Sequence, residues 1–211
     1  MHHVMFDIDG TLLQSYDFDS DCFVDAVKEV TGINVEPDWS NYTHVTDSGI
    51  LSEIIDSNTI PQQGEIHEQV KCVFVRKIEQ SIKQNPVKEI PGAASFLALL
   101  DSMDDVVVSF ATGGWYESAV LKLRSAGIDF SSIPVASSND HFVRAEIMKI
   151  ADTMATGNRE LPCTYFGDGG WDKKACEQLG INFVLVGDKV DHNQKIENFQ
   201  SVDEAMTYIG L

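Results

Sequence analysis

Short β-branched runs alternate with helix-length amphipathic segments along most of this 211-residue chain. Strands are expected at residues 4–6, 106–110, 133–136, 164–166 and 181–186, and helical patterns cover residues 115–126, 142–154, 171–179 and 202–209. Strands that alternate with helices are typical of a parallel sheet covered by helices. The pattern therefore predicts an α/β fold with a Rossmann-like parallel sheet.

Residues 14–85 interrupt this alternation, because their apolar residues recur at helical spacing and form no convincing strand. The three apolar stripes are Phe23, Val27 and Val30, then Ile50, Leu51, Ile54 and Ile55, then Ile66, Val70, Val73, Ile78 and Ile82. We expect an all-helical cap over residues 14–85, inserted into a sheet domain made of residues 1–13 and 86–211. Pro86 and Pro91 mark the return to the sheet domain.

The net charge of the chain argues against polyanionic partners. It has 33 acidic residues against 15 Lys and Arg, a formal net charge of −18. Nucleic acids and anionic membranes attract clustered cations and repel a net anion. We therefore expect neither a nucleic-acid polymer nor a membrane surface as a partner, and the sequence indicates no obligate protein partner.

The cysteines and the hydropathy pattern indicate an intracellular protein. Cys22, Cys72, Cys163 and Cys176 form no CxxC pair, so we interpret them as reduced thiols rather than zinc ligands or disulfides. No signal-peptide pattern opens the chain, and no apolar stretch approaches 18 residues. A cytoplasmic location is expected.

Polar residues follow four of the expected strands, at the ends where parallel-sheet enzymes place their sites. They comprise carboxylates, a hydroxyl, a guanidinium and a glycine before a helix: Asp7, Asp9, Thr11, Thr112, Gly113, Arg144, Asp168 and Asp172. Converging carboxylates need a cation, and an all-oxygen ligand set favours Mg²⁺ over zinc. Arg144, Thr112 and the Gly113 amide are donors suited to a phosphoryl group. The pattern indicates metal-assisted phosphoryl transfer.

With these residues identified, the sequence resembles the haloacid dehalogenase superfamily of aspartate-nucleophile phosphohydrolases, in the helical-cap subgroup that includes phosphoglycolate phosphatase and β-phosphoglucomutase. Residues 7–11, Asp-Ile-Asp-Gly-Thr, resemble its first motif, DxDGT, and Thr112-Gly113 resemble the second. Arg144 lies where the third motif has Lys or Arg, and Gly167-Asp168-Gly169 with Asp172 resemble the fourth, GDGxxxD. The four motifs occur in order across essentially the whole chain.

The resemblance implies a role for each matching residue. Asp7 is the nucleophile that becomes an aspartyl-phosphate, and Asp9 is the general acid and base. Thr112, Gly113 and Arg144 bind the phosphoryl group, while Asp7, Asp9 through its backbone carbonyl, Asp168 and Asp172 hold Mg²⁺. Lys is commoner than Arg in the third motif, so Lys149, five residues after Arg144, remains an alternative. The acid at position 9 favours phosphate esters over carbon–halogen bonds as substrates.

The resemblance also places substrate selection in the cap. Residues 43–49, Thr-His-Val-Thr-Asp-Ser-Gly, lie where this subgroup has its specificity segment, and His44 is the candidate specificity residue. Residues 1–70 contain 14 acids and a single base, Lys28. A leaving group with a second phosphate or a carboxylate would find no cationic partner there. We therefore expect a neutral, hydroxyl-bearing or cationic leaving group.

Three functions remain open from the sequence. The first is a Mg²⁺-dependent phosphatase that hydrolyses a small phosphorylated metabolite. The second is a sugar phosphomutase of the β-phosphoglucomutase type, which has the same motifs but needs a cationic cap for its bisphosphate intermediate. The third is a non-catalytic binding protein on the same fold, which is disfavoured because every motif residue is present.

Overall fold

The computed structural model describes residues 1–210 and contains a six-stranded sheet and eight α-helices within that range. Leu211, the last residue of the predicted sheet domain, lies outside the described residues. The strands are β1 (His2–Phe6), β2 (Val106–Ala111), β3 (Val135–Ala136), β4 (Cys163–Gly167), β5 (Asn182–Val186) and β6 (Lys195–Ile196). The helices are α1 (Tyr16–Thr31), α2 (Asp47–Ser57), α3 (Gln63–Gln84), α4 (Ala93–Asp101), α5 (Tyr116–Ser125), α6 (Arg144–Thr156), α7 (Gly170–Leu179) and α8 (Val202–Ile209).

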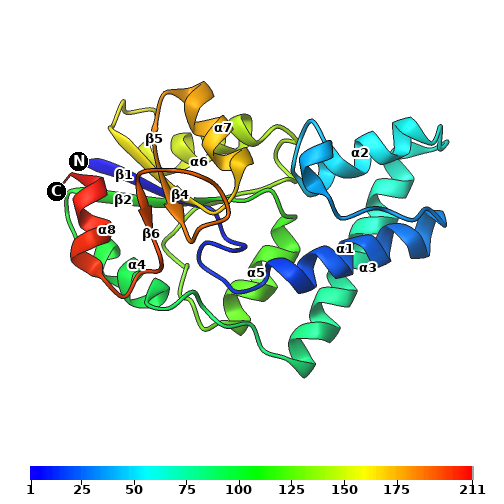
Figure 1. Cartoon of the computed structure of the whole chain (residues 1–211), viewed down its shortest axis with the longest axis horizontal. Helices are drawn as coiled ribbons and strands as arrows, with labels where there is room; N and C mark the ends of the chain where they lie inside the picture. The colour runs from blue at the N-terminus through cyan, green and yellow to red at the C-terminus, as the bar shows by residue number, and fades with distance from the viewer. Residues whose placement is uncertain (211) are drawn as a thin grey trace.

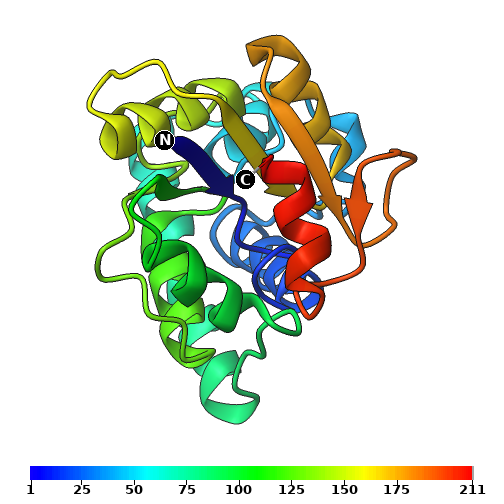
Figure 2. The same cartoon turned by 90° about the vertical axis from the view of Figure 1, so that its left-hand side faces the viewer.

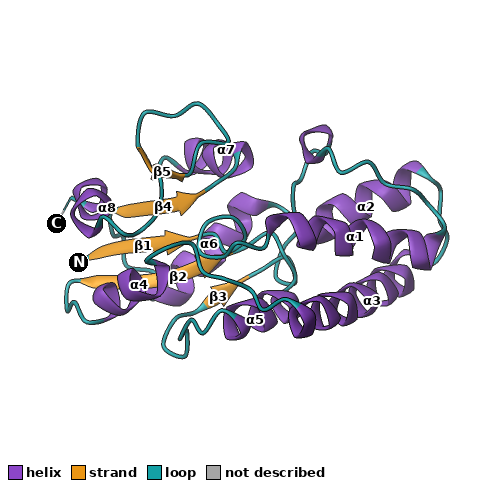
Figure 3. Cartoon of the chain, turned by 60° about the horizontal axis from the view of Figure 1, so that its bottom comes forward, coloured by secondary structure: helices purple, strands orange, loops and turns teal. Residues whose placement is uncertain are grey.

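All strand pairs of the sheet are parallel, in the order β3-β2-β1-β4-β5-β6 (Figure 3). The first strand lies in the middle, where Phe6 pairs with Phe110 on β2 and with Phe166 on β4. The chain order reverses on the two sides of β1, and such a reversal is where open parallel sheets bind their ligands. The expected α/β class with a Rossmann-like sheet is confirmed.

Helices cover both faces of the sheet, and alternate residues of β1 divide between the two faces. Val4 and Phe6 pack with α4, α5 and α8 in one apolar cluster that also contains Phe110 and Phe166. Met5 points to the other face and packs with α6 and α7 in a second cluster. Figure 2 shows the end of the sheet between these helical layers. Strands buried on both faces account for their nearly continuous apolar sequence.

Helices α1, α2 and α3 form a separate group beyond the carboxyl ends of the strands (Figure 1). Their apolar faces enclose their own cluster, which includes Phe23 from α1, Ile54 from α2 and Phe74 from α3. Trp115, which precedes α5, also packs in this cluster, at 5.4 Å between ring centroids from Phe74. The helical group is thus joined to the sheet through the segment that follows β2.

The pattern analysis above predicts neither α4 nor β6. Strand β6 has only two residues and exists through its pairing with β5, in which Lys195 lies opposite Leu185. The expected strand at 133–136 is also shorter, because Pro134 has no N–H to donate and pairing begins at Val135. No helix within the described residues is long and apolar enough to span a membrane.

Candidate active site

The site lies where β1, β2 and β4 end together. Because Phe6 pairs with both Phe110 and Phe166, the residues that follow these strands emerge at the same edge of the sheet. Asp7 follows β1 directly, and its backbone N–H donates to the carbonyl of Phe166 at 2.9 Å. The strand register therefore brings Asp7, Thr112 and Asp168 together from three distant parts of the sequence.

A glycine is required in the turn after β1. Gly10 has a φ of +81°, a conformation that L side chains rarely adopt. A Cβ at this position would lie 1.9 Å from Oδ2 of Asp168, far closer than van der Waals contact allows. The glycine thus lets the first motif's backbone pass directly against the fourth motif's carboxylate.

Three buried carboxylates converge at this edge. One oxygen from each of Asp7, Asp168 and Asp172 lies within 4.8 Å of the others. Burial and the neighbouring Asp172 raise the pKa of Asp7 well above its ordinary value, although Arg144 opposes this effect. Burial and Asp172 also raise the pKa of Asp168 to about 6. Oδ1 of Asp168 is buried with no hydrogen-bond partner. An all-oxygen cluster with an unpartnered carboxylate oxygen fits a hard divalent cation such as Mg²⁺.

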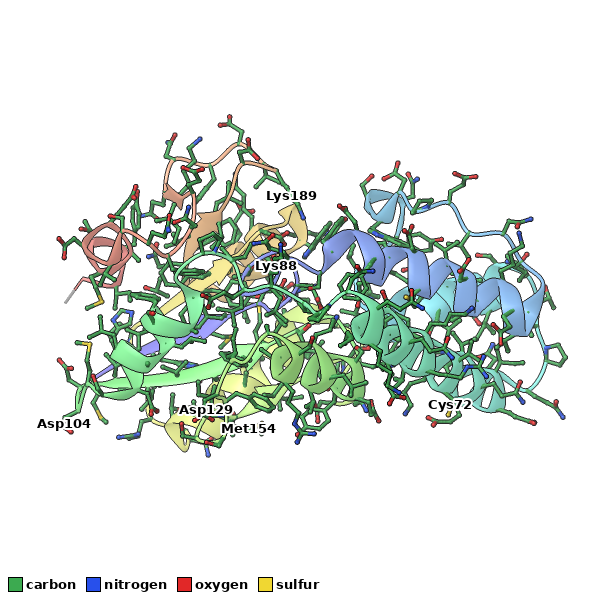
Figure 4. All side chains as sticks on the ribbon, turned by 90° about the horizontal axis from the view of Figure 1, so that it is seen from below. Cys72, Lys88, Asp104, Asp129, Met154 and Lys189 are labelled. Atoms are coloured by element: carbon green, nitrogen blue, oxygen red, sulfur yellow. The ribbon has the colours of Figure 1, made fainter. Side chains whose placement is uncertain are left out.

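Both oxygens of Asp172 and the second oxygen of Asp168 have protein partners. Asp172 accepts hydrogen bonds from Arg144 Nη1 at 2.8 Å, from the Tyr165 hydroxyl at 3.1 Å and from the Gly169 N–H at 3.0 Å. Lys189 pairs with Oδ2 of Asp168. Its Nζ also lies 3.5 Å from the centre of the Tyr16 ring, and Figure 4 shows Lys189 at the junction between the sheet and α1.

Arg144, the first residue of α6, reaches the carboxylate cluster, whereas Lys149 does not. Nη1 of Arg144 lies 3.5 Å from Oδ1 of Asp7, and Nη2 donates to the Val45 carbonyl at 3.1 Å. Burial would lower the pKa of this guanidinium, but Asp172 and Asp7 raise it above its ordinary value. Lys149 lies one turn further on an exposed face and pairs with Glu146.

The side chain of Asp9 is not one of the three converging carboxylates and has other partners. It accepts hydrogen bonds from Ser15 and, at 2.7 Å, from Lys122 on α5. Lys122 is fully buried and pairs also with Asp19 on α1. Burial would lower the pKa of Lys122, but Asp19 and Asp9 raise it above its ordinary value. Lys122 thus links Asp9, which follows the first strand of the sheet, to Asp19 of the α1–α3 group.

A cavity of about 80 Å³ opens above Asp7 and Asp9, between the sheet and the α1–α3 group. Thr112, Gly113 and Arg144 line it with these two aspartates, so five of the predicted site residues share one cavity. The opposite wall comes from the helical group and includes Tyr16, Asp19, Trp39 and Asp47. Trp171 of α7 completes the rim. We call this space the site cavity.

The start of α2, in the wall opposite the strand ends, is hydrogen-bonded to the segment that follows β2. The Asp47 N–H donates to the Gly113 carbonyl at 2.8 Å, and within that segment the Gly114 N–H donates to Thr112 Oγ1 at 3.0 Å. The Trp115 N–H donates to Oδ2 of Asp47 at 2.8 Å. The start of α2 therefore docks on the segment that carries the second motif.

His44 is not placed in the site cavity, contrary to its predicted role as the specificity residue. Its N–H donates to Glu53 at 3.1 Å, and its ring packs on Phe142 at 5.2 Å between centroids, in a neighbouring hollow. Three residues later the chain enters α2, whose first turn directs Asp47 into the site cavity. The predicted segment is therefore adjacent to the site, but a different side chain faces it.

Lys122, Asp19 and Asp47 are site residues that sequence reasoning missed. A partial signal exists for Lys122, because the helical period places it with Ser118 and Ala119 on the buried face of α5. Lysine is seldom fully buried unless it is paired, so its place on that face indicates a carboxylate partner. No comparable signal distinguishes Asp19 among the many acids of the first 70 residues. Asp47 lies in the predicted specificity segment, residues 43–49, but His44 was the candidate chosen there.

The family model described as haloacid dehalogenase-like hydrolase matches residues 4–186. This match includes all four motifs and the site cavity, and the chain belongs to the haloacid dehalogenase-like hydrolase family. No curated protein matches the sequence significantly.

Solved structures with low sequence identity share the fold. A β-phosphoglucomutase from Clostridium difficile has a TM-score of 0.76 at 14% identity, with 100% of this chain and 97% of that chain covered. A hydrolase from Pseudomonas syringae has a TM-score of 0.72 at 18% identity, covering 99% and 90%. CbbY from Rhodobacter sphaeroides, in complex with phosphate, has a TM-score of 0.71 at 14% identity, covering 96% of each chain.

Proposed function

We propose that this protein is a Mg²⁺-dependent phosphatase that hydrolyses a small phosphomonoester through an aspartyl-phosphate on Asp7. The observation that carries the proposal is the shared cavity of Asp7, Asp9, Thr112 and Arg144 beside a buried carboxylate cluster. Family membership supports a hydrolase, and the CbbY neighbour in complex with phosphate supports phosphate as the group bound.

The proposed reaction has two displacements. An oxygen of Asp7 attacks phosphorus while the bond from phosphorus to the leaving oxygen breaks, and Asp9 gives its proton to that oxygen. Asp9 then takes a proton from water, whose oxygen attacks the aspartyl-phosphate and releases Asp7 and inorganic phosphate. Ser15 and Lys122 orient Asp9 for both proton transfers.

Asp7, Asp168 and Asp172 are the residues proposed to hold Mg²⁺, together with the backbone carbonyl of Asp9. When bound, this cation neutralises phosphoryl oxygens and reduces their repulsion of the nucleophile. The chain itself supplies a second positive charge at the phosphoryl position, since Arg144 lies 3.5 Å from Asp7. Thr112 and the Gly113 amide are proposed as additional donors to the phosphoryl oxygens.

Phosphate release from a panel of phosphomonoesters, with Mg²⁺ or EDTA, tests the proposal. Native protein is expected to release phosphate only with Mg²⁺, and Asp7→Asn to lose at least roughly 10³-fold in kcat, because the nucleophile is gone. The matched control is Asp17→Asn, an exposed position on α1 outside the site cavity, which should retain native turnover. Release that persists in Asp7→Asn would contradict the mechanism.

A phosphomutase is less well supported by the cavity. Such an enzyme must bind a second phosphate, and Arg144 is the sole cationic side chain among the described residues that line the cavity. If a folded protein releases no phosphate from any ester, interconversion of glucose phosphate isomers is the next assay. Inactivity in both assays, with no aspartyl-phosphate mimic formed from Mg²⁺ and beryllium fluoride, would favour a non-catalytic binding protein.

A further inference from the structure

Asp47 is a buried carboxylate that faces the site cavity without a cationic partner. Its side chain is only 9% exposed and lines the cavity. Oδ2 accepts the Trp115 N–H, but Oδ1 has no hydrogen bond, and no Lys, Arg or His of the described chain lies within ion-pair distance. Burial and the neighbouring Asp19 raise the pKa of Asp47 well above its ordinary value, as expected for a carboxyl group that lacks a cation of its own. A cationic group on the ligand would supply that partner.

Asp47 lies on the same side of the cavity as Asp9. A Cβ at Gly114 would lie 3.6 Å from Oδ2 of Asp9 and 3.8 Å from Oδ2 of Asp47. Since Asp9 is the proposed proton donor to the leaving oxygen, a group that reaches Asp47 must be attached within a few bonds of that oxygen. The small volume of the cavity, about 80 Å³, agrees with a leaving group of a few non-hydrogen atoms.

The charges at this end of the cavity favour a cation over a neutral group. Asp9, Asp19 and Asp47 face one another there, and Lys122 is the cation paired with the first two. Lys122 already pairs with both Asp9 and Asp19, and Asp47 has no ion pair of its own within the described chain. A hydroxyl can only hydrogen-bond to Asp47, whereas an ammonium also supplies the positive charge that favours the ionised carboxylate.

Resting on the proposed phosphatase function, we propose that the substrate is the phosphate ester of a small amino alcohol, and that Asp47 binds its ammonium group. Asp47 is then the residue that determines leaving-group specificity, in the place that the sequence suggested for His44. The aromatic rings of Tyr16 and Trp39 on the same wall add apolar surface for the short carbon chain.

Three esters of similar length separate the alternatives, since they differ mainly in the terminal group: ethanolamine phosphate, 2-hydroxyethyl phosphate and phosphoglycolate. We expect kcat/KM for the amine to exceed that for the hydroxyl by on the order of 10-fold or more, with the carboxylate last, because Asp47 attracts the first and repels the third. Equal or better turnover of the hydroxyl or the carboxylate ester would overturn the inference while leaving a phosphatase.

The variant Asp47→Asn assigns the effect to this residue. Its amide oxygen still accepts the Trp115 N–H, so α2 keeps its docking contact while the charge is removed. The preference for amine over hydroxyl should fall to about one, since only a dipole now faces the terminal group. Asp21→Asn, an exposed position on α1, is the matched control and should keep the native ratio. An unchanged ratio in Asp47→Asn would overturn the assignment.

A binding measurement separates this inference from the proposed function. Calorimetry on the Asp7→Asn protein, with Mg²⁺ present, is expected to show ethanolamine phosphate binding at least about 10-fold more tightly than 2-hydroxyethyl phosphate. Preferential binding without turnover by native protein would reject the phosphatase but keep the ammonium site. Turnover of esters without this preference would reject the ammonium site but keep the phosphatase. Equal binding of the two esters would also reject the ammonium site.

Discussion

At the scale of single residues, Lys122 joins two carboxylates that come from different parts of the molecule. Its side chain has no exposed surface, and it pairs with Asp9 at 2.7 Å and with Asp19 across the boundary between the sheet and the α1–α3 group. A buried charge is tolerated only when it is paired. The same contacts orient the proposed acid and base and fasten α1 to α5.

Lys122→Met is expected to destabilise the protein by about 3–5 kcal/mol, because it leaves two carboxylates close together without their cation. Urea denaturation with EDTA at neutral pH measures this change. Lys149→Met is the matched control, because Lys149 is exposed and pairs only with Glu146, so its effect should stay within about 0.5 kcal/mol. A similar small loss for Lys122→Met would show that the buried pairs contribute little.

At the scale of elements, the start of α4 depends on a close approach between two loops. Gly92 has a φ of +84°, and a Cβ there would lie 2.6 Å from the backbone carbon of Phe199. The Phe199 N–H donates to the Pro91 carbonyl at 2.9 Å, so the two segments are held together at this point. The loop before α8 thus packs directly on the turn that begins α4.

Gly92→Ala should therefore lower the free energy of unfolding more than an alanine substitution at a glycine that has only a positive φ. Gly127, after α5, has a φ of +73° with nothing within 4 Å of its missing Cβ. We expect Gly127→Ala to lose about 1 kcal/mol from backbone strain and Gly92→Ala at least about 2 kcal/mol, since backbone atoms must also move. Thermal unfolding of both variants provides the comparison, and equal losses would contradict the close-approach argument.

At the scale of the whole molecule, stability without metal should depend on pH through the buried acids. Burial raises the pKa of both Asp168 and Asp19 to about 6, from an ordinary value of 3.8. An acid whose pKa is raised in the folded state stabilises the fold below its unfolded pKa, and this contribution is lost as the pH rises through the folded pKa. The metal-free protein should therefore lose this contribution between pH 4 and 6.

The variant Asp168→Asn isolates one of these groups. With EDTA present, raising the pH from about 4.5 to about 7 should lower the free energy of unfolding of the native protein by roughly 2 kcal/mol more than that of the variant. Urea denaturation at the two pH values gives the difference. Mg²⁺ should restore stability to the native protein at the higher pH, and parallel pH dependences in EDTA would count against a raised pKa for Asp168.

The fold class, the order of the motifs and the residues at the strand ends could be predicted from the amino-acid sequence. These features are local, because a β-branched run, a turn glycine and the polar residue after a strand are adjacent in the chain. Asp7, Asp9, Thr112, Gly113 and Arg144 were predictable for this reason, and the structure brings them to one cavity.

The side chains that complete the site could not be predicted in this way, because contacts between distant segments select them. His44 and Asp47 lie three residues apart in one segment, and the docking of α2 on the second motif turns Asp47 inward while His44 packs on Phe142. Lys122 acquires its role because α1 and α5, which are distant in sequence, meet at Asp19. Strand β6 likewise depends on its pairing with β5. Such contacts join distant segments, so no pattern within a short stretch of sequence specifies them.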